Sequence, residues 1–319
     1  MALTVGSASH RAVIGVGVDD ELADLLAAGE RAAFHGRPAS GVATLQLAFD
    51  QARAAGRGAE ATAAAWLLGV CLGAAGKFGS ALAVLDPLAA QQGTDVPERR
   101  LFAALAAATS ASVRRQLGQH AAAKAMDERA LALADGGPEA TFDALLGLAA
   151  DAVGLADVDS AHERLRQAAL LAEPRTDWWR QHVRLAWIRA EVALLEGNPA
   201  AAAEVLRPAI SSAEVSGAPR HVAKSLLFLG VSQVQAGQLE EAEGTLRRAA
   251  TLAESLGTIP LLWPARALLG ALLDERSPAE AAKSLSAARG AVIAIADDLP
   301  EELRSVWLDR PDVTALLGG

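Results

Sequence analysis

The stretch AKSLLFLGVSQVQAGQLEEAEGTLRRAATLAESLG, residues Ala223 to Gly257, decides the fold. Apolar residues recur every three or four positions on both sides of Gly237, which is the spacing of one face of an α-helix. A glycine between two such segments is typical of a tight turn. The stretch therefore predicts two amphipathic helices joined as a hairpin, with apolar positions at Leu226, Leu229, Val234, Leu239, Ala242, Leu246, Ala249 and Leu252.

The same pattern repeats along most of the chain. The small residue Ala242 has counterparts spaced by roughly 40 residues, and such a period is typical of a solenoid of helix pairs in which each unit packs on its neighbours. The chain therefore predicts an all-α solenoid of about seven hairpins. The small position is occupied by Gly41, Ala81, Ala123, Ala161, Ala202, Ala242 and Ala281.

Two further positions keep this register. The predicted turn is occupied by Gly36, Gly76, Gly118, Ala156, Gly197, Gly237 and Arg276. The closest approach of the first helix to the second falls at Gly29, Gly69, Ala111, Ala149, Ala190, Gly230 and Leu269, where small residues let two backbones approach. Asp127 departs from the pattern, because an apolar residue is expected at its place in the third unit, and Leu269 and Arg276 make the last unit the least regular.

The unit at Ala223–Gly257 resembles a tetratricopeptide repeat, although its period exceeds the family's standard length of about 34 residues. The matching positions are Leu226, Leu229, Gly230, Gly237, Ala242, Leu246 and Ala249. The resemblance implies a right-handed solenoid in which the first helix of each hairpin lines the concave face. The long period and the tail WLDRPDVTALL (residues 307–317) also resemble the helical-repeat regions of large bacterial signalling ATPases and LuxR-type regulators, whose repeats sense an effector or partner.

Composition supports the all-α prediction. The 319 residues are 52% hydrophobic but only 4% aromatic, with no tyrosine, so alanine and leucine supply most of the apolar content and both favour helices. A net charge of −9 without a basic tract argues against direct binding of nucleic acid. The N-terminus does not read as a signal peptide, and no apolar run reaches the ~18 residues of a membrane span. We expect a soluble, cytoplasmic protein without membrane contact.

Three segments are predicted. Residues 1–18 lack a helical period and form an N-terminal arm, residues 19–296 form the solenoid, and residues 297–319 form a C-terminal capping helix and tail. The capping helix has an apolar face made of Leu299, Leu303, Val306 and Trp307.

Catalytic motifs are missing from the sequence. It contains no HExxH, GxSxG or GxxxxGK[ST] pattern, and its six histidines fall in different units without a metal-binding spacing. Cys71, the single cysteine, lies in an apolar helical run and is expected to be a buried, unreactive thiol. We therefore predict a protein that is not an enzyme and holds no metal or cofactor.

The tetratricopeptide resemblance implies a partner groove on the first helices. Trp66 and Trp187 share one position in their units, and Trp263 lies one turn earlier in its own. Tryptophan is enriched at binding hot spots, but the same rings equally suit gaps between alanine-rich helices. The predicted groove residues are Trp66, Val70, Arg115, Asp143, Arg184, Trp187, Glu191, Lys224, Leu227, Val231, Trp263 and Arg266.

These features predict a scaffold that binds a protein or peptide in its concave groove, as a regulatory sensor or adaptor in a bacterial cell. One alternative is a receptor for a sugar-like small molecule that stacks on Trp66, Trp187 and Trp263. A less favoured alternative is an enzyme subunit, which requires histidines and carboxylates from separate units to converge in the groove.

Overall fold

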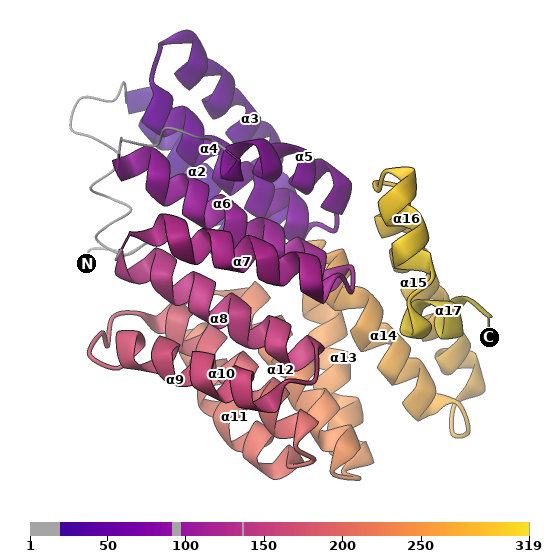
Figure 1. Ribbon diagram of the computed structural model, residues 1–319. Coiled ribbons are helices and arrows are strands. Elements are labelled where there is room, and N and C mark those ends of the chain that lie inside the picture. The colour runs from indigo at the N-terminus through magenta and orange to yellow at the C-terminus, as the bar shows by residue number, and fades with distance from the viewer. Residues whose placement is uncertain (1–19, 91–96, 136, 319) are drawn as a thin grey trace.

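A computed structural model describes residues 20–90, 97–135 and 137–318 of the chain (Figure 1). The described residues form sixteen α-helices and no strand, and successive helices pack as antiparallel hairpins. The predicted all-α solenoid is confirmed. The predicted arm at residues 1–18 lies outside the described residues.

Seven hairpins follow one another along the solenoid, and their turns lie at the predicted positions. Their bounds are α2 (Asp20–His35) with α3 (Pro38–Ala54), α4 (Gly58–Ala74) with α5 (Phe78–Ala89), α6 (Pro97–Gln116) with α7 (His120–Ala134), α8 (Pro138–Gly154) with α9 (Val158–Ala172), α10 (Trp179–Leu195) with α11 (Pro199–Val215), α12 (Pro219–Gln235) with α13 (Leu239–Leu256), and α14 (Ile259–Leu273) with α15 (Pro278–Ala296).

The predicted turn residue adopts a left-handed backbone in five of the seven hairpins. Gly197 has φ 72° and is typical of this group, which also includes Gly76, Gly118 and Gly237. Ala156 has φ 56° in the fourth hairpin, although a β-carbon disfavours this region by about 1–2 kcal/mol. The left-handed turn therefore forms even in the fourth hairpin, whose turn residue is not glycine.

In the first, second, sixth and seventh hairpins the first helix has a glycine notch that receives a leucine, whereas the other three hairpins have alanine at this position. A β-carbon added to Gly230 would lie 2.6 Å from Cδ2 of Leu246, so only glycine fits there. The seventh hairpin corrects one prediction: the notch is formed by Gly270, where an added β-carbon would lie 2.6 Å from Cγ of Leu285, and not by Leu269. The register of that hairpin is shifted by one residue.

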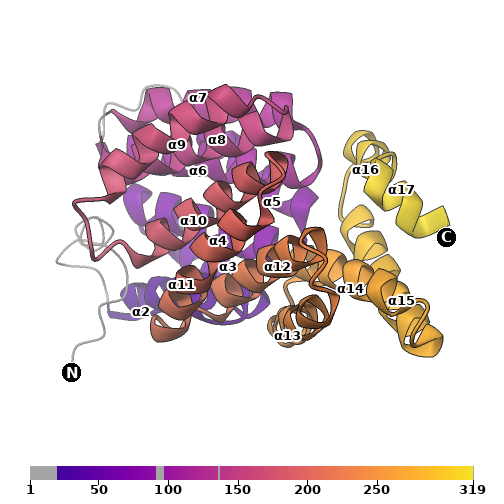
Figure 2. The same ribbon diagram turned by 90° about the horizontal axis from the view of Figure 1, so that it is seen from below.

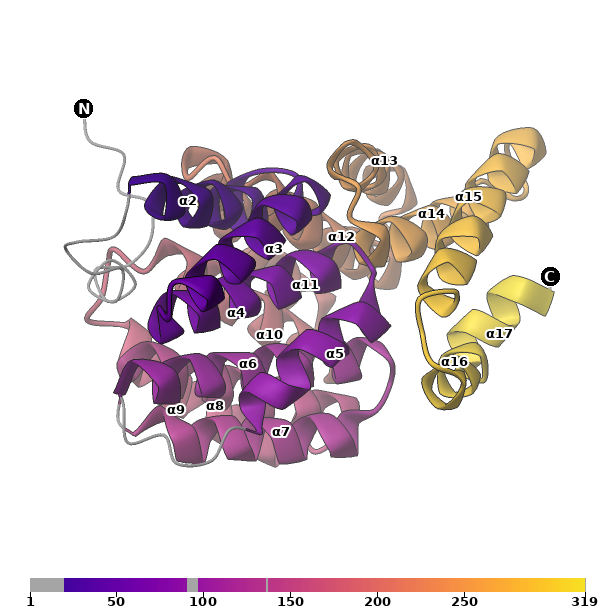
Figure 3. The ribbon, with the colours of Figure 1, turned by 90° about the horizontal axis from the view of Figure 1, so that it is seen from above.

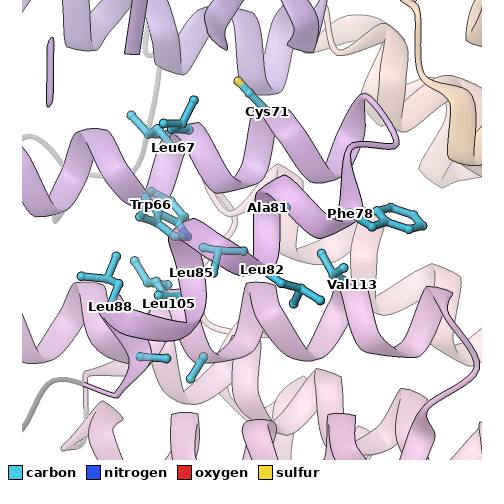
Figure 4. Packing of buried hydrophobic residues seen from close by; sticks show 14 of the residues in the cluster. Trp66, Leu67, Cys71, Phe78, Ala81, Leu82, Leu85, Leu88, Leu105 and Val113 are labelled. Atoms are coloured by element: carbon cyan, nitrogen blue, oxygen red, sulfur yellow. The ribbon is translucent and has the colours of Figure 1, made fainter. Parts of the chain in front are cut away.

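Most of the core consists of clusters that neighbouring hairpins share, whereas Leu269, Leu273 and Ala281 form a small separate cluster within the seventh hairpin. Figure 4 shows α4, α5 and α6 contributing to one shared cluster, in which Leu85 is fully buried beneath the notch of Gly69. Cys71 belongs to the same cluster, and burial raises the pKa of its thiol to about 12. The labelled side chains in this view are Trp66, Leu67, Cys71, Phe78, Ala81, Leu82, Leu85, Leu88, Leu105 and Val113.

The superhelix curves until its first hairpins touch its later ones. Figures 2 and 3 show α2 and α12 toward the same side of the molecule, and the two helices contact each other directly. The Thr258 hydroxyl donates a hydrogen bond to the Ala74 carbonyl at 2.8 Å, although 184 residues separate them. His35 Nδ1 lies 3.3 Å from the carbonyl oxygen of Gly217. We call this junction between α2–α4 and α10–α14 the seam.

The C-terminal helices also contact an early hairpin. Two short helices, α16 (Glu301–Leu308) and α17 (Pro311–Gly318), follow the last hairpin, so a second helix accompanies the expected one. Trp307 is buried against Phe78 of the second hairpin, with ring centroids 6.5 Å apart, and its indole N–H donates to the Val292 carbonyl at 3.1 Å. Val306 is 39% exposed and does not join the buried face that the sequence predicts.

Within residues 20–90, 97–135 and 137–318, none of the helices combines the length and apolarity that crossing a bilayer requires.

Candidate functional site

The structure separates the predicted groove residues into two groups. Trp66, Asp143, Trp187 and Leu227 are buried. The remaining ones keep part of their surface accessible to solvent: Val70, Arg115, Arg184, Glu191, Lys224, Val231, Trp263 and Arg266. All lie on the first helices of their hairpins, as the register predicts.

Trp66 is a packing residue. Its side chain is 4% exposed, and its indole N–H donates to the Thr109 hydroxyl of α6 at 3.1 Å. Its ring lies between Phe34 of α2 and Phe102 of α6, at centroid distances of 6.3 Å and 5.9 Å. The ring therefore links three successive first helices and presents almost no surface to a ligand.

Trp187 is similarly enclosed. It is 7% exposed, its indole N–H donates to the Ser225 hydroxyl at 2.7 Å, and its ring stacks on His221 at 5.4 Å. The Lys224 ammonium lies 4.5 Å from its ring centroid, within cation–π range. Trp187 therefore positions its neighbours on α12.

Trp263 does not share the repeat position of Trp66 and Trp187, and it contacts different elements. It packs against Trp307 with centroids 5.9 Å apart, and the Arg310 guanidinium lies 5.9 Å from its ring. Its half-buried neighbour Arg266 is paired with Glu254 at 2.6 Å. Trp263 therefore belongs to the packing of the C-terminal helices, whereas Arg266 links α14 to α13.

Arg115 is committed to an ion cluster between the third and fourth hairpins. It pairs with Asp127 at 2.7 Å and with Asp151 at 2.6 Å, and both carboxyl groups are fully buried. Burial raises the pKa of both carboxyl groups, and that of Asp127 most strongly, although the nearby guanidinium opposes the shift. A proton held on one of them leaves one negative charge opposite one positive charge.

Two predicted groove residues and two further cations lie at the seam and form a group that we call the interior cations: Arg180, Arg184, Arg220 and Lys224. They are half-buried and lie four residues apart in pairs, on α10 and on α12, so each pair shares one helix face. Arg184 pairs with Asp143 of α8. Within the described part of the chain, no carboxylate lies within ion-pair distance of the other three.

Arg184 and Lys224 are among the predicted groove residues, whereas Arg180 and Arg220 are not. The missed residues lie one helical turn before the identified ones, on the same face. The resemblance to tetratricopeptide repeats predicts groove residues mainly in the middle of each first helix. Closure of the superhelix also brings the first turns of α10 and α12 into the interior. The i, i+4 repetition of cations on two successive helices is the signal that identifies them.

The surroundings of the interior cations disfavour their charge. Desolvation lowers the pKa of Lys224 to about 8 and that of Arg220 to about 10, and neighbouring guanidinium groups contribute in both cases. The same desolvation raises the pKa of Glu191, whose charge attracts Lys224. It also lowers the pKa of His221, which is 2% exposed and faces three arginines.

The interior cations are suited to binding an anionic group. Guanidinium and ammonium groups donate hydrogen bonds and attract anions. Among the described residues no three His, Cys, Asp or Glu side chains are gathered as ligands for a metal ion.

Comparison with known proteins supports the fold. No family model matches the chain, and no curated protein matches it by sequence. A crystal structure of a Rap protein complexed with Competence and Sporulation Factor has a TM-score of 0.62 and 14% identity, and the match covers 94% of this chain and 86% of that one. Aspartyl phosphate phosphatase F from Bacillus subtilis has a TM-score of 0.50 and 15% identity, with 95% and 84% covered.

These likenesses support the tetratricopeptide-like solenoid. They do not extend to the LuxR-type regulators and signalling ATPases that the tail of the chain resembles. One of the similar structures bears the name of a phosphatase, so the comparison leaves the prediction of a non-enzymatic protein as a prediction.

Proposed function

We propose that this chain is a regulatory scaffold that binds a peptide on the interior face of its superhelix. The observation that carries the proposal is the set of charged, half-buried side chains on that face, among them Arg184, Glu191 and Lys224. Desolvating such groups costs free energy, and an apolar interior would make the fold more stable. A face that keeps them is suited to a partner that completes their hydrogen bonds.

The comparison with the Rap protein supports the same use of the fold. That protein was crystallised with a separately named factor, and its likeness to this chain extends over most of both chains. We propose that the present chain likewise binds a ligand and acts as a sensor or adaptor in the cytoplasm of a bacterial cell, without catalytic activity or a cofactor.

The geometry favours a peptide over the sugar-like ligand of the sequence analysis. A stacking site for a sugar needs an open ring face, whereas Trp66 and Trp187 are almost fully buried. A peptide instead uses alternating polar and apolar contacts. The accessible Val70 and Val231 and the charged Glu191 and Lys224 supply both kinds.

Selection from a random peptide library displayed on phage tests the proposal. Peptides recovered on the intact chain are expected to lose at least about tenfold in affinity with Lys224→Met or Glu191→Gln, since a hydrogen bond to a charged group contributes about 1.5–3 kcal/mol. The matched outer variants Lys283→Met and Glu204→Gln alter exposed residues and should leave binding unchanged. Failure to recover any peptide, or equal effects of inner and outer variants, would overturn the proposal.

A further inference from the structure

The seam brings a concentration of positive charge into the interior of an acidic protein. The chain carries a net charge of −9, yet Arg180, Arg184, Arg220 and Lys224 face one another across α10 and α12. Arg180 also reaches the first hairpin, where its guanidinium lies 4.8 Å from the ring centroid of Phe34. The cations therefore lie where the later hairpins meet the first ones.

Four carboxylates surround the four cations, but among the described residues only one of them forms a direct ion pair with a cation of this group. Asp143 pairs with Arg184, while Glu30, Glu139 and Glu191 exert only a longer-range attraction on Arg180 or Lys224. Arg220 repels Lys224 and is itself repelled by the other two arginines. Burying cations side by side costs free energy unless each gains an anionic partner at ion-pair distance.

Arg180 and Lys224 are positioned in a way that leaves their N–H donors available. Lys224 lies over the rings of Trp187 and Phe228, at 4.5 Å and 5.4 Å, and Arg180 lies over Phe34. An aromatic face attracts a cation without accepting its hydrogen bonds in the usual lone-pair geometry, so it orients the group and does not saturate it.

Unpartnered buried atoms provide an independent sign of a missing ligand. Arg220 Nε is buried without a hydrogen-bond partner among the described residues, and so is Nδ1 of His221, which is 2% exposed. Buried polar atoms are nearly always hydrogen-bonded, so each exception requires an explanation. Two exceptions on adjacent residues of α12, beside unpaired cations, point to one site.

We propose that the seam is an oxyanion site, formed by Arg180, Arg184, Arg220 and Lys224, that takes a carboxylate of the bound peptide and thereby holds the superhelix closed. The planar fork of a guanidinium matches the two oxygens of a carboxylate, and Arg180 and Arg220 each present a fork that forms no ion pair among the described residues. This inference rests on the proposed function for the source of the carboxylate, whereas the anion site itself is tested separately.

Thermal unfolding in inorganic sulfate, with chloride at equal ionic strength as the reference, tests the site. Sulfate is expected to raise Tm of the intact chain more than that of Arg220→Met/Lys224→Met, which should be the more stable protein without sulfate because it lacks the repulsion. The double variant Arg189→Met/Lys283→Met removes the same charge from exposed positions, one of them on α10. Its sulfate response should equal that of the intact chain.

A general salting effect of sulfate would appear equally in all three proteins, and that result would overturn the oxyanion site. A Tm that falls in Arg220→Met/Lys224→Met without sulfate would also contradict it, because the cations would then be stabilising the fold by themselves.

Synthetic random peptides distinguish a peptide carboxylate from a free inorganic anion. One pool is rich in Asp and Glu and has a free C-terminal carboxylate, and the other has Asn and Gln in their place and a C-terminal amide. Each pool is incubated with the protein, and bound peptides are identified by mass spectrometry after size exclusion. Acidic peptides should be recovered at least about tenfold more than amides, and sulfate should compete with them. Recovery of both pools equally, with no specific sulfate response, would reject the inference and retain the proposed function. A sulfate response without bound peptides would retain the anion site and reject the proposed function and the peptide carboxylate.

Discussion

The third and fourth hairpins depart from the repeat at positions where the fifth and sixth follow it. Leu206 and Leu246 are fully buried at the core position of the second helix in the fifth and sixth hairpins, whereas the third hairpin has Asp127 there. Gly197 and Gly237 form the fifth and sixth turns, whereas the fourth turn has Ala156. The turn residue nevertheless adopts a left-handed backbone in all four hairpins.

The difference shows what the repeat requires and what it tolerates. A leucine at the core position packs against a small residue of its own hairpin, as Leu246 does at Gly230. Asp127 instead leans against Gly147 of the following hairpin, where Arg115 supplies a guanidinium and Asp151 a second carboxyl group. A charged residue is therefore accepted only because its partners come from both neighbouring first helices.

The largest expected effect comes from removing the cation of this cluster. Arg115→Met leaves two buried carboxyl groups without their counter-charge, and breaking a buried pair in this way costs about 3–5 kcal/mol. Urea unfolding followed by circular dichroism measures the loss. Arg247→Met, which removes a half-exposed cation from its pairs with Glu243 and Glu280, should cost less than about 1 kcal/mol and serves as the control. Similar losses in both variants would mean that the cluster contributes no more than a surface pair.

The pH dependence of the free energy of unfolding should also differ between the third hairpin, which has Asp127, and the sixth, which has Leu246. The pKa of Asp127 is raised in the folded chain, so the folded state binds more protons than the unfolded state above the ordinary carboxyl pKa. Lowering the pH from 7 toward 5 should therefore stabilise the native chain relative to Asp127→Asn, by up to about 1.4 kcal/mol per pH unit. Leu246 has no such group, and Leu246→Val should show a pH-independent difference. A constant difference for Asp127→Asn would contradict a raised pKa.

Packing in the regular region is tested by two glycines of the sixth hairpin. Gly230→Ala places a β-carbon 2.6 Å from Leu246 and should destabilise the chain by about 1–2 kcal/mol after the gain in helix propensity. Gly244 lies in the partner helix with nothing within 4 Å of an added β-carbon, so Gly244→Ala should stabilise by about 0.5–1 kcal/mol. Opposite signs in urea unfolding support the register, and a neutral Gly230→Ala would show that Leu246 moves aside.

Comparison of these regions also explains why the sequence predicted the hairpins so well. The period depends on local rules, namely helical spacing, turn glycines and small residues at crossings, and each rule acts within one hairpin or its neighbour. The shift from Leu269 to Gly270 escaped prediction because the seventh turn has no glycine to mark its register.

The candidate site was predicted only in part because it depends on closure of the whole superhelix. The resemblance to tetratricopeptide repeats placed Arg184 and Lys224 on the interior side, but no local rule places Phe34 beside Arg180 or Ala74 beside Thr258. Those contacts join hairpins that are far apart in the chain, and their geometry follows from the summed curvature of the units between them. Trp66 and Trp187 are packing residues for a more local reason, because side chains of the adjacent first helices enclose their rings.

The smallest expected effect lies at the turns and tests whether the backbone of the fourth hairpin is imposed by its neighbours. Ala156 has φ 56°, so Ala156→Gly should stabilise the chain by up to about 1 kcal/mol, since glycine enters this region without the β-carbon penalty but gains freedom in the unfolded chain. Gly197→Ala is the reciprocal change at the corresponding turn, where φ is 72° and nothing lies within 4 Å of an added β-carbon. It should cost about 1 kcal/mol, because only the backbone conformation opposes it. Equal and opposite shifts in the urea midpoint would show that both turns are set by one geometry. A loss in Ala156→Gly would instead show that the methyl group of Ala156 contributes packing that the regular hairpins lack.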